Sequence, residues 1–251
     1  MKILASYNIK GGVGKTAAAI NLAYCAAREG ARTLIWDLDP QGAATFYLRI
    51  KPKIKGGGKA LLTRKRELDS AIKASNYANL DVLPADFSYR NMDLVLDDVK
   101  HQSKRLLKLL RPLSEEYDYV FLDCPPSISL VSENIFHAAD ALLVPTIPTP
   151  LSLHTLEQLI GFCIKYKLYD LQILPFLSMV DRRKGLHRNI SDHPPALLSN
   201  MLHSVIPYAT EVEQMGEHRK PIGEFAASSR AAQSFAALWQ EIQQRIVATK
   251  T

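Results

Sequence analysis

A glycine-rich segment near the N-terminus constrains the fold of this chain more than any other feature. Residues 9–16 read Ile-Lys-Gly-Gly-Val-Gly-Lys-Thr and stand between an apolar run that predicts a strand (2–7) and an Ala- and Leu-rich run that predicts a helix (16–29). Glycines allow backbone N–H groups to approach phosphate oxygens, and the following helix points its N-terminus at them. The sequence therefore predicts a phosphate-binding loop, to which we assign Lys10, Gly11, Gly12, Val13, Gly14, Lys15, Thr16 and Ala17.

Two lysines and a threonine carry the chemistry of this loop. Lys15 supplies a positive charge to the phosphates, and Thr16 offers a hydroxyl to Mg²⁺. The ordinary pattern has glycine at position 9, where this chain has Ile9, and Lys10 adds a second lysine at the head of the loop. The alternative is a glycine-rich turn that arose by chance, which the flanking strand and helix disfavour.

The rest of the sequence predicts an α/β fold. Short apolar runs alternate with helical patterns, which is typical of a doubly wound, mostly parallel sheet flanked by helices. With 251 residues, 47% of them hydrophobic, we expect one domain over residues 1–251. Further strands are predicted at 33–37, 80–83, 119–123, 141–144 and 172–179, and further helices at 103–113, 130–138, 151–167, 196–201 and 231–247.

Acidic residues close two of the predicted strands. Asp37 and Asp39 end one of them, in the segment Asp-Leu-Asp-Pro-Gln-Gly, and Asp123 ends another. Carboxylates at strand ends beside a phosphate loop can hold the water molecules of Mg²⁺ or orient an attacking water. We therefore expect Thr16, Asp39 and Asp123 to form a magnesium site. The alternative for Asp39 is an aspartate that only caps its own loop.

In this order the motifs resemble those of the deviant Walker A ATPases, a family that includes ParA, Soj, MinD and the nitrogenase iron protein. The resemblance extends over nearly the whole chain and implies a slow, partner-stimulated ATP hydrolase with ATP and Mg²⁺ as cofactors. It implies that Lys10 reaches the phosphates of the partner subunit in an ATP-dependent homodimer, and that Asp39 positions the hydrolytic water. The catalytic residues that it implies are Lys10, Lys15 and Asp39.

The resemblance also extends to the base pocket and has two departures. Segments around Asp181 and Pro207 are similar to those that contact adenine in the family. Ala17 stands where the family usually has Thr or Ser, which removes a hydroxyl near the α-phosphate but leaves the backbone N–H groups of the first helical turn. The segment 51–75 is more basic than expected of a ParA, and its glycine- and lysine-rich part, 51–59, predicts a mobile surface loop.

Positive charge makes a polyanionic partner possible. The formal net charge is +6, and ParA-like proteins bind DNA nonspecifically through basic residues in their C-terminal half. Such binding needs several cations on one face, and a dimer doubles their number. A solvated basic surface is the alternative. The candidate DNA-binding residues are Arg182, Arg183, Lys184, Arg188, Arg219, Lys220 and Arg230.

Two other roles within the resemblance are less favoured. A MinD-like membrane anchor would need a basic, bulky amphipathic terminal helix, whereas the polar side of 231–247 carries Gln and Glu and the tail after Val247 lacks that mixture. An iron–sulfur carrier would need cysteines that bridge two subunits, and the three cysteines of this chain are scattered. Core packing is therefore the interpretation of the last helix, and no membrane partner is expected.

The resulting expectation is a cytoplasmic, nucleoid-associated ATPase. Its partners would be a second copy of the chain, nonspecific DNA, and a ParB-like or cargo-adaptor protein that stimulates hydrolysis. The cargo would be a plasmid, a chromosome or a protein assembly. A regulatory nucleotide-binding protein in which hydrolysis is incidental is the rival from another class.

Overall fold

The computed structural model describes residues 1–63, 68–98 and 102–247, and these residues form a seven-stranded sheet with the order β3-β4-β2-β5-β1-β6-β7. Neighbouring strands are parallel except β3 and β4, which are antiparallel. The predicted doubly wound α/β fold is confirmed. The strands are β1 (Lys2–Ser6), β2 (Thr33–Asp37), β3 (Lys73–Ala74), β4 (Leu80–Leu83), β5 (Tyr119–Asp123), β6 (Ala141–Thr146) and β7 (Gln172–Leu177).

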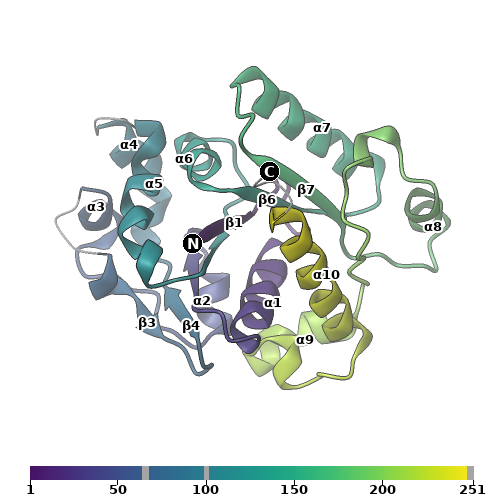
Figure 1. Ribbon diagram of the computed structural model, residues 1–251, viewed down its shortest axis with the longest axis horizontal. Coiled ribbons are helices and arrows are strands. Elements are labelled where there is room, and N and C mark those ends of the chain that lie inside the picture. The colour runs from purple at the N-terminus through teal and green to yellow at the C-terminus, as the bar shows by residue number, and fades with distance from the viewer. Residues whose placement is uncertain (64–67, 99–101, 248–251) are drawn as a thin grey trace.

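Helices cover both faces of the sheet (Figure 1), with α6 and α7 on one side of the central strands and α1 and α10 on the other. Along each central strand, alternate side chains pack against the helical layers on the two faces of the sheet. Leu4 and Phe121 pack with α1 and α10, whereas Ala5 and Leu122 pack with the layer of α4 to α7. The helices are α1 (Lys15–Arg28), α2 (Ala43–Tyr47), α3 (Gly57–Leu62), α4 (Met92–Asp97), α5 (Arg105–Leu110), α6 (Leu130–Ala138), α7 (Pro150–Lys165), α8 (Gly185–Asp192), α9 (Thr210–His218) and α10 (Arg230–Val247).

The strand register brings three polar side chains to one edge of the sheet. Asp123 at the end of β5 pairs with Ser6 of β1 on one side and with Asp37 of β2 on the other. Because the three strands are parallel, their carboxyl ends meet at this edge, where ligands bind in open α/β sheets. The glycine-rich loop leaves β1 at the same edge.

The predicted helix at 196–201 is wrong. Only a 3₁₀ turn forms there, at Ala196–Leu198, after two successive prolines. The backbone N–H of Leu202 donates to the carbonyl of Pro175 in β7, at 2.8 Å. The chain therefore has to straighten after the turn to pair with β7, which leaves no length for a helix.

The prediction of a surface loop at 51–59 is wrong for its second half. Helix α3 begins at Gly57, and Ile54 and Gly58 are buried. A Cβ atom on Gly58 would lie 2.7 Å from a ring carbon of Tyr89, so glycine is required there by close packing. The glycine run therefore allows the start of α3 to pack closely against Tyr89.

The sequence analysis did not predict β3, α2, α3, α4, α8 or α9. These helices have five to nine residues, and β3 has only two. Helices of this length are marginal in isolation and depend on tertiary packing. Their apolar periodicity is too short to be read from sequence alone.

The last helix packs into the core, as predicted. Its apolar face is buried through Phe235, Leu238, Trp239, Ile242 and Ile246. The indole of Trp239 meets the ring of Tyr119 edge-on at 4.9 Å, and its N–H donates to Oε2 of Glu29 at 2.9 Å. The tail after Val247 lies outside the described residues. Within the described part of the chain, no helix is long and apolar enough to cross a membrane.

Replacement of Trp239 by Ala tests this packing. The change removes a fully buried indole and its hydrogen bond, so we expect the free energy of unfolding to fall by about 3–5 kcal/mol. Urea denaturation of the nucleotide-free chain measures it. The matched control is Gln240→Ala on the exposed side of the same helix, with an expected change within about 0.5 kcal/mol. Equal stability of the two variants would contradict the assignment of α10 to the core.

Candidate nucleotide and magnesium site

Glycines shape the loop between β1 and α1. Gly12 and Gly14 have φ angles of 70° and 95°, in the left-handed region that side chains disfavour. A Cβ atom on Gly14 would also lie 3.0 Å from Oγ of Ser178. That hydroxyl, directly after β7, donates to the carbonyl of Val13 at 2.9 Å. The loop is therefore held against the β7 end of the sheet with its backbone exposed to a ligand.

Side chains at the end of β1 fasten both ends of the loop. The amide of Asn8 accepts a hydrogen bond from the backbone N–H of Lys10 and donates one to the carbonyl of Pro145, both at 2.9 Å. The hydroxyl of Ser6 donates to the carbonyl of Lys15 at 2.8 Å. These bonds fix the loop to β1 and β6 before any ligand is present.

Lys15 places a buried cation inside the loop. The residue is 7% exposed, and Nζ donates to the carbonyl of Lys10 at 3.0 Å. Burial lowers the pKa of the ammonium, although Asp123 and Asp39 nearby act in the opposite direction. An anion bound in the loop would stabilise the charged form further.

Asp123, at the end of β5, is a carboxylate withdrawn from water. It is fully buried, and neither of its oxygens makes a hydrogen bond of ordinary geometry with a described residue. Burial raises its pKa well above the usual range, and Asp37 adds to this, while the Thr16 hydroxyl is close enough to act in the opposite direction. An unsatisfied buried carboxylate is costly unless a ligand completes it.

The donors at this edge fit a magnesium ion. Mg²⁺ prefers hard oxygen ligands and keeps several of its waters. The two orphaned oxygens of Asp123 and the hydroxyl of Thr16 are such ligands, and Asp39 lies near enough to influence the pKa of Asp123. Three of the residues predicted from sequence are thus brought to one place.

Asp37 has a structural role at the same edge. Its Oδ2 accepts hydrogen bonds from the backbone N–H and the hydroxyl of Thr45, at 2.8 Å and 2.7 Å. The Thr45 hydroxyl in turn accepts a hydrogen bond from the backbone N–H of Ala85 at 2.8 Å. Burial raises the pKa of Asp37 to about 6, against the effect of these bonds. This series of hydrogen bonds connects β2 to α2 and to the segment after β4.

Asp39 caps its own turn. Its Oδ1 accepts a hydrogen bond from the backbone N–H of Gln41 at 2.9 Å, and its carbonyl accepts one from Gly42 at 2.9 Å. The side chain is partly exposed, unlike those of Asp37 and Asp123. The geometry is therefore compatible with a capping role and with a catalytic role for Asp39, and a substitution is needed to distinguish the two.

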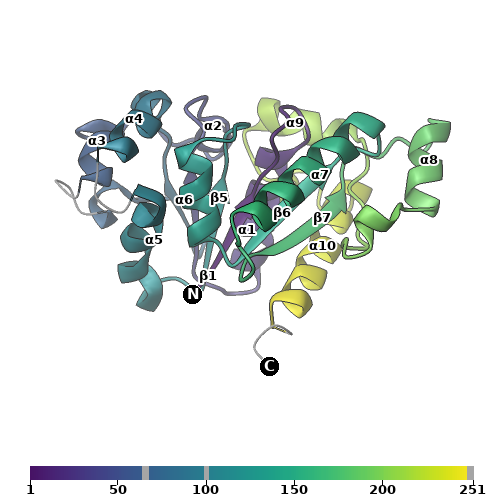
Figure 2. The same ribbon diagram turned by 90° about the horizontal axis from the view of Figure 1, so that it is seen from above.

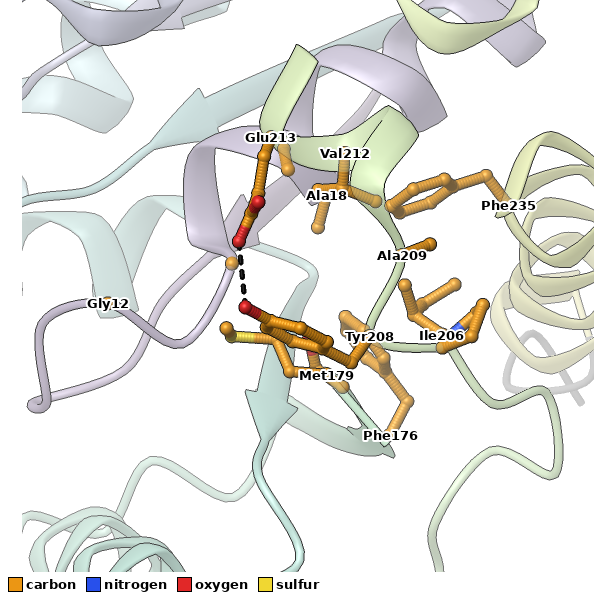
Figure 3. Close-up of a pocket in the computed structure, with 14 residues that line it drawn as sticks. Gly12, Ala18, Phe176, Met179, Ile206, Tyr208, Ala209, Val212, Glu213 and Phe235 are labelled. Carbon is orange, nitrogen blue, oxygen red and sulfur yellow. Dashed lines mark hydrogen bonds between the residues drawn. The ribbon is translucent and has the colours of Figure 1, made fainter. Parts of the chain in front are cut away.

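An apolar cavity adjoins the loop (Figure 3). It has a volume of about 200 Å³ and reaches Gly12, Gly14 and Ala17 at one end. The hydroxyl of Tyr208 donates to Oε1 of Glu213 at 2.8 Å. Such a cavity with a few polar groups could take the base of a nucleotide whose phosphates lie in the loop. The other labelled side chains around it are Ala18, Phe176, Met179, Ile206, Ala209, Val212 and Phe235.

Of the two residues predicted for the base pocket, the structure brings only one to the cavity. Pro207, which the resemblance implied for the base pocket, is among the residues that line the cavity. Asp181 is not; its carboxylate accepts hydrogen bonds from the guanidinium of Arg183, both at 2.9 Å, beside a neighbouring pocket. The hydrogen bonds to Arg183 lower the pKa of Asp181 to about 2. Asp181 is thus among the residues of the neighbouring pocket and not among those of the apolar cavity.

The seven predicted DNA-binding residues fall into two groups. Arg182, Arg183 and Arg230 line one pocket, near Lys184 and Arg188 at α8. Arg219 and Lys220 lie instead at the end of α9. The guanidinium of Arg219 donates to the carbonyl of Phe46 at 2.9 Å and lies 4.3 Å from the centre of its ring. The sequence did not reveal this division.

Several residues of the site, among them Ser6, Asn8, Ser178 and Glu213, were not predicted from the sequence. Asn8 follows the predicted strand 2–7, and Ser178 lies near the end of the predicted strand 172–179, so a polar residue at a strand end was the available signal. Tyr208 and Glu213 meet only because a turn and α9 fold together, and no pattern in the sequence predicts the hydrogen bond between them. Cys124, next to Asp123, is 1% exposed, and burial raises the pKa of its thiol well above the usual range.

The orphaned carboxylate predicts an unusual pH dependence in Mg²⁺-free and nucleotide-free buffer. Because the pKa of Asp123 is raised on folding, the folded chain binds more protons than the unfolded chain above about pH 3.9, and the contribution of this group to stability falls as the pH rises. Asp123→Asn removes the charge. We expect the stability of the variant, relative to the wild type, to increase from about pH 4 toward neutrality.

Urea denaturation across this pH range measures the difference. The control is Asp118→Asn, because hydrogen bonds from Arg32 lower the pKa of Asp118 to about 2 and its contribution is constant above about pH 5. A flat difference for Asp123→Asn as well would show that its carboxylate is not destabilised by burial.

Comparison with known proteins agrees with the geometry. Residues 1–173 match a family model described as an AAA domain. The chain is 32% identical over 247 residues to the sporulation initiation inhibitor protein Soj of Bacillus subtilis, covering 96% of this chain and 98% of that protein. It is also 32% identical over 250 residues to the chromosome partitioning protein ParA of Myxococcus xanthus, covering 97% and 88%.

A solved structure shares the fold. A putative plasmid partition protein of Borrelia burgdorferi, bound to AMPPNP, superposes with a TM-score of 0.84 at 22% identity, covering 97% of this chain and 99% of that chain. The family match spans more than half of the chain, and the two relatives extend along nearly all of it. The chain therefore belongs to the ParA/Soj family of deviant Walker A ATPases.

Proposed function

We propose that residues 1–251 act as one ParA-type ATPase domain that binds Mg²⁺-ATP, dimerises on ATP, binds DNA nonspecifically and hydrolyses ATP slowly until a partner stimulates it. One observation carries the proposal. A buried cation, Lys15, and an orphaned buried carboxylate, Asp123, flank a glycine loop beside an apolar cavity. This combination suits a nucleoside triphosphate with its metal ion.

Each part of the site has a role in the proposal. Lys15 and the backbone N–H groups of the loop would bind the phosphates, and Thr16 and Asp123 would hold Mg²⁺. The metal, when bound, neutralises charge that develops on the transferred phosphoryl group. The cavity takes the base and ribose. The B. burgdorferi relative with bound AMPPNP supports ATP as the nucleotide.

Lys10 is proposed to close the dimer. Its backbone is tied to Asn8 and Lys15, but its ammonium makes no hydrogen bond or ion pair with a described residue. A flexible cation at the head of a phosphate loop can reach a phosphate of an adjacent copy. Dimerisation would then depend on the γ-phosphate.

Lys10→Ala tests this role. We expect the variant to bind Mg²⁺-ATP with nearly unchanged affinity but to remain monomeric where the wild type dimerises, because only the contact across the interface is lost. Light scattering coupled to size exclusion measures the mass. Lys104→Ala, an exposed lysine outside the loop, is the control. A Lys10→Ala dimer that forms with ATP would reject the proposed role.

Asp39 is proposed to position the attacking water. We expect Asp39→Ala to retain the ATP dimer and to lower the hydrolysis rate by about 10²- to 10⁴-fold. Asp39→Asn separates catalysis from capping, because its amide oxygen still accepts the hydrogen bond from Gln41. If phosphate release by Asp39→Asn equals that of the wild type, the residue only caps its turn. Full activity of both variants would favour incidental hydrolysis by a regulatory nucleotide-binding protein.

DNA binding is proposed for the basic residues near α8, where Arg182, Arg183 and Arg230 line one pocket with Lys184 and Arg188 nearby. We expect binding of random-sequence duplex with ATP only, and a slope of log affinity against log salt that falls by about 1 for each cation removed. Fluorescence anisotropy with ATP, ADP and no nucleotide measures it. Arg182→Ala and Arg230→Ala are the informative variants. Equal affinity for the duplex with ATP, with ADP and without nucleotide would contradict control of DNA binding by ATP.

The cycle would place the protein in the cytoplasm, on the nucleoid, where a ParB-like or cargo-adaptor partner stimulates hydrolysis and a plasmid, chromosome or protein assembly is positioned. The Soj and ParA relatives support a partition role. A MinD-like membrane anchor by α10 is disfavoured, since the apolar face of that helix is buried in the core. Liposome binding without DNA binding would reverse this preference.

A further inference from the structure

A second basic surface lies far from α8. Segments 49–56 and 70–74 enclose an open groove of about 790 Å³ beside β3, the edge strand of the sheet. In both views the α3–β3 side of the molecule is opposite α8 (Figures 1 and 2). Five cations and no carboxylate are among its described lining residues. The cations are Arg49, Lys51, Lys53, Lys55 and Lys73.

The lysine segment of this groove is anchored to the fold. The side chain of Ile54 is 4% exposed and belongs to the core, and its backbone N–H donates to Oδ2 of Asp86 at 2.8 Å. Asp86 also accepts two hydrogen bonds from Ser88, and these bonds lower its pKa against the opposing effect of burial. Lys53 and Lys55 flank this anchor, so their positions on the surface are defined by it.

The lysines of the groove are not engaged in ion pairs. Lys51, Lys53, Lys55 and Lys73 are exposed, and none of them forms an ion pair with a carboxylate of a described residue. Asp86, whose pKa the charge of Lys53 helps to lower, accepts its hydrogen bonds from Ile54 and Ser88. The groove therefore presents uncompensated positive charge to solvent.

Arg49 joins this groove to the end of α9. Its guanidinium donates to the carbonyls of His218 and Arg219, at 2.9 Å and 3.3 Å. Arg219 and Lys220, which the sequence analysis grouped with the residues near α8, thus lie next to the groove. The basic surface extends from α9 across Arg49 to the lysines around Ile54.

We propose that this groove binds the phosphate backbone of duplex DNA, as a second contact besides the residues near α8. The inference rests on the proposed DNA-binding function and adds a surface to it. The groove is too open for one phosphate group and is lined by several cations, as backbone contacts require. No aromatic side chain is among its described lining residues, which disfavours single strands held by base stacking.

The test compares two triple variants with the same change in charge. Lys51, Lys53 and Lys55 are replaced by Gln in one, and Lys104, Lys165 and Lys167, exposed lysines on other surfaces, in the other. Anisotropy of a fluorescein-labelled duplex is titrated with the full chain and Mg²⁺-ATP over a salt series. We expect the groove variant to lose about 2 to 3 units of salt slope and at least about tenfold in affinity near 0.1 M salt.

The remaining variants separate the outcomes. The control triple should keep most of the wild-type slope. A triple variant with Arg in place of Lys51, Lys53 and Lys55 should show the wild-type slope again. Equal slopes for the two Gln triples would overturn the groove while leaving DNA binding by the residues near α8 intact. A wild type that binds no duplex in any nucleotide state would overturn both. Binding of phosphatidylserine vesicles by the groove lysines, with unchanged duplex binding, would also reject the proposal.

Discussion

The buried charges of Lys15 and Asp123 are the constraint on which the rest of the site depends. A cation and a carboxylate are both withdrawn from water, yet neither carboxylate oxygen makes a hydrogen bond of ordinary geometry with a described residue. Neither charge is stabilised well by the protein alone. A polyanion with a divalent cation would satisfy both, since its phosphates pair with the lysine and its metal with the carboxylate. The two buried charges therefore lower the stability of the ligand-free site, and ligand binding would remove this destabilisation.

The fold brings these groups together through strand register and loop geometry. Parallel pairing sets Asp123 beside Asp37 and Ser6, and Ser6 in turn holds the carbonyl of Lys15. Left-handed glycines let the loop turn back from β1 into α1 without side-chain collisions. Helices pack on both faces of the sheet through two clusters of buried apolar side chains. The position of the site follows from the topology, and its chemistry follows from a few polar residues at strand ends.

Local patterns predicted the central strands and the phosphate loop because each is coded by adjacent residues. Strand β5 and its terminal Asp123 could be read from one apolar run closed by one acid. Contacts between distant segments could not. The hydrogen bond from Ser178 to Val13, the hydrogen bond from Arg49 to His218 and the burial of Ile54 each need the folded chain. Short helices such as α8 and α9 were missed because packing, more than periodicity, stabilises them.

Thermal unfolding with and without Mg²⁺-ATP tests the central claim most directly. A ligand that binds the native state at a hundred times its dissociation constant stabilises it by about 2.7 kcal/mol, which for a chain of this size raises Tm by about 5–10 °C. The account predicts this rise for Mg²⁺-ATP and its loss when Lys15 is replaced by Ala. An unchanged Tm of the wild type at millimolar Mg²⁺-ATP would contradict the assignment of the buried charges to a nucleotide site.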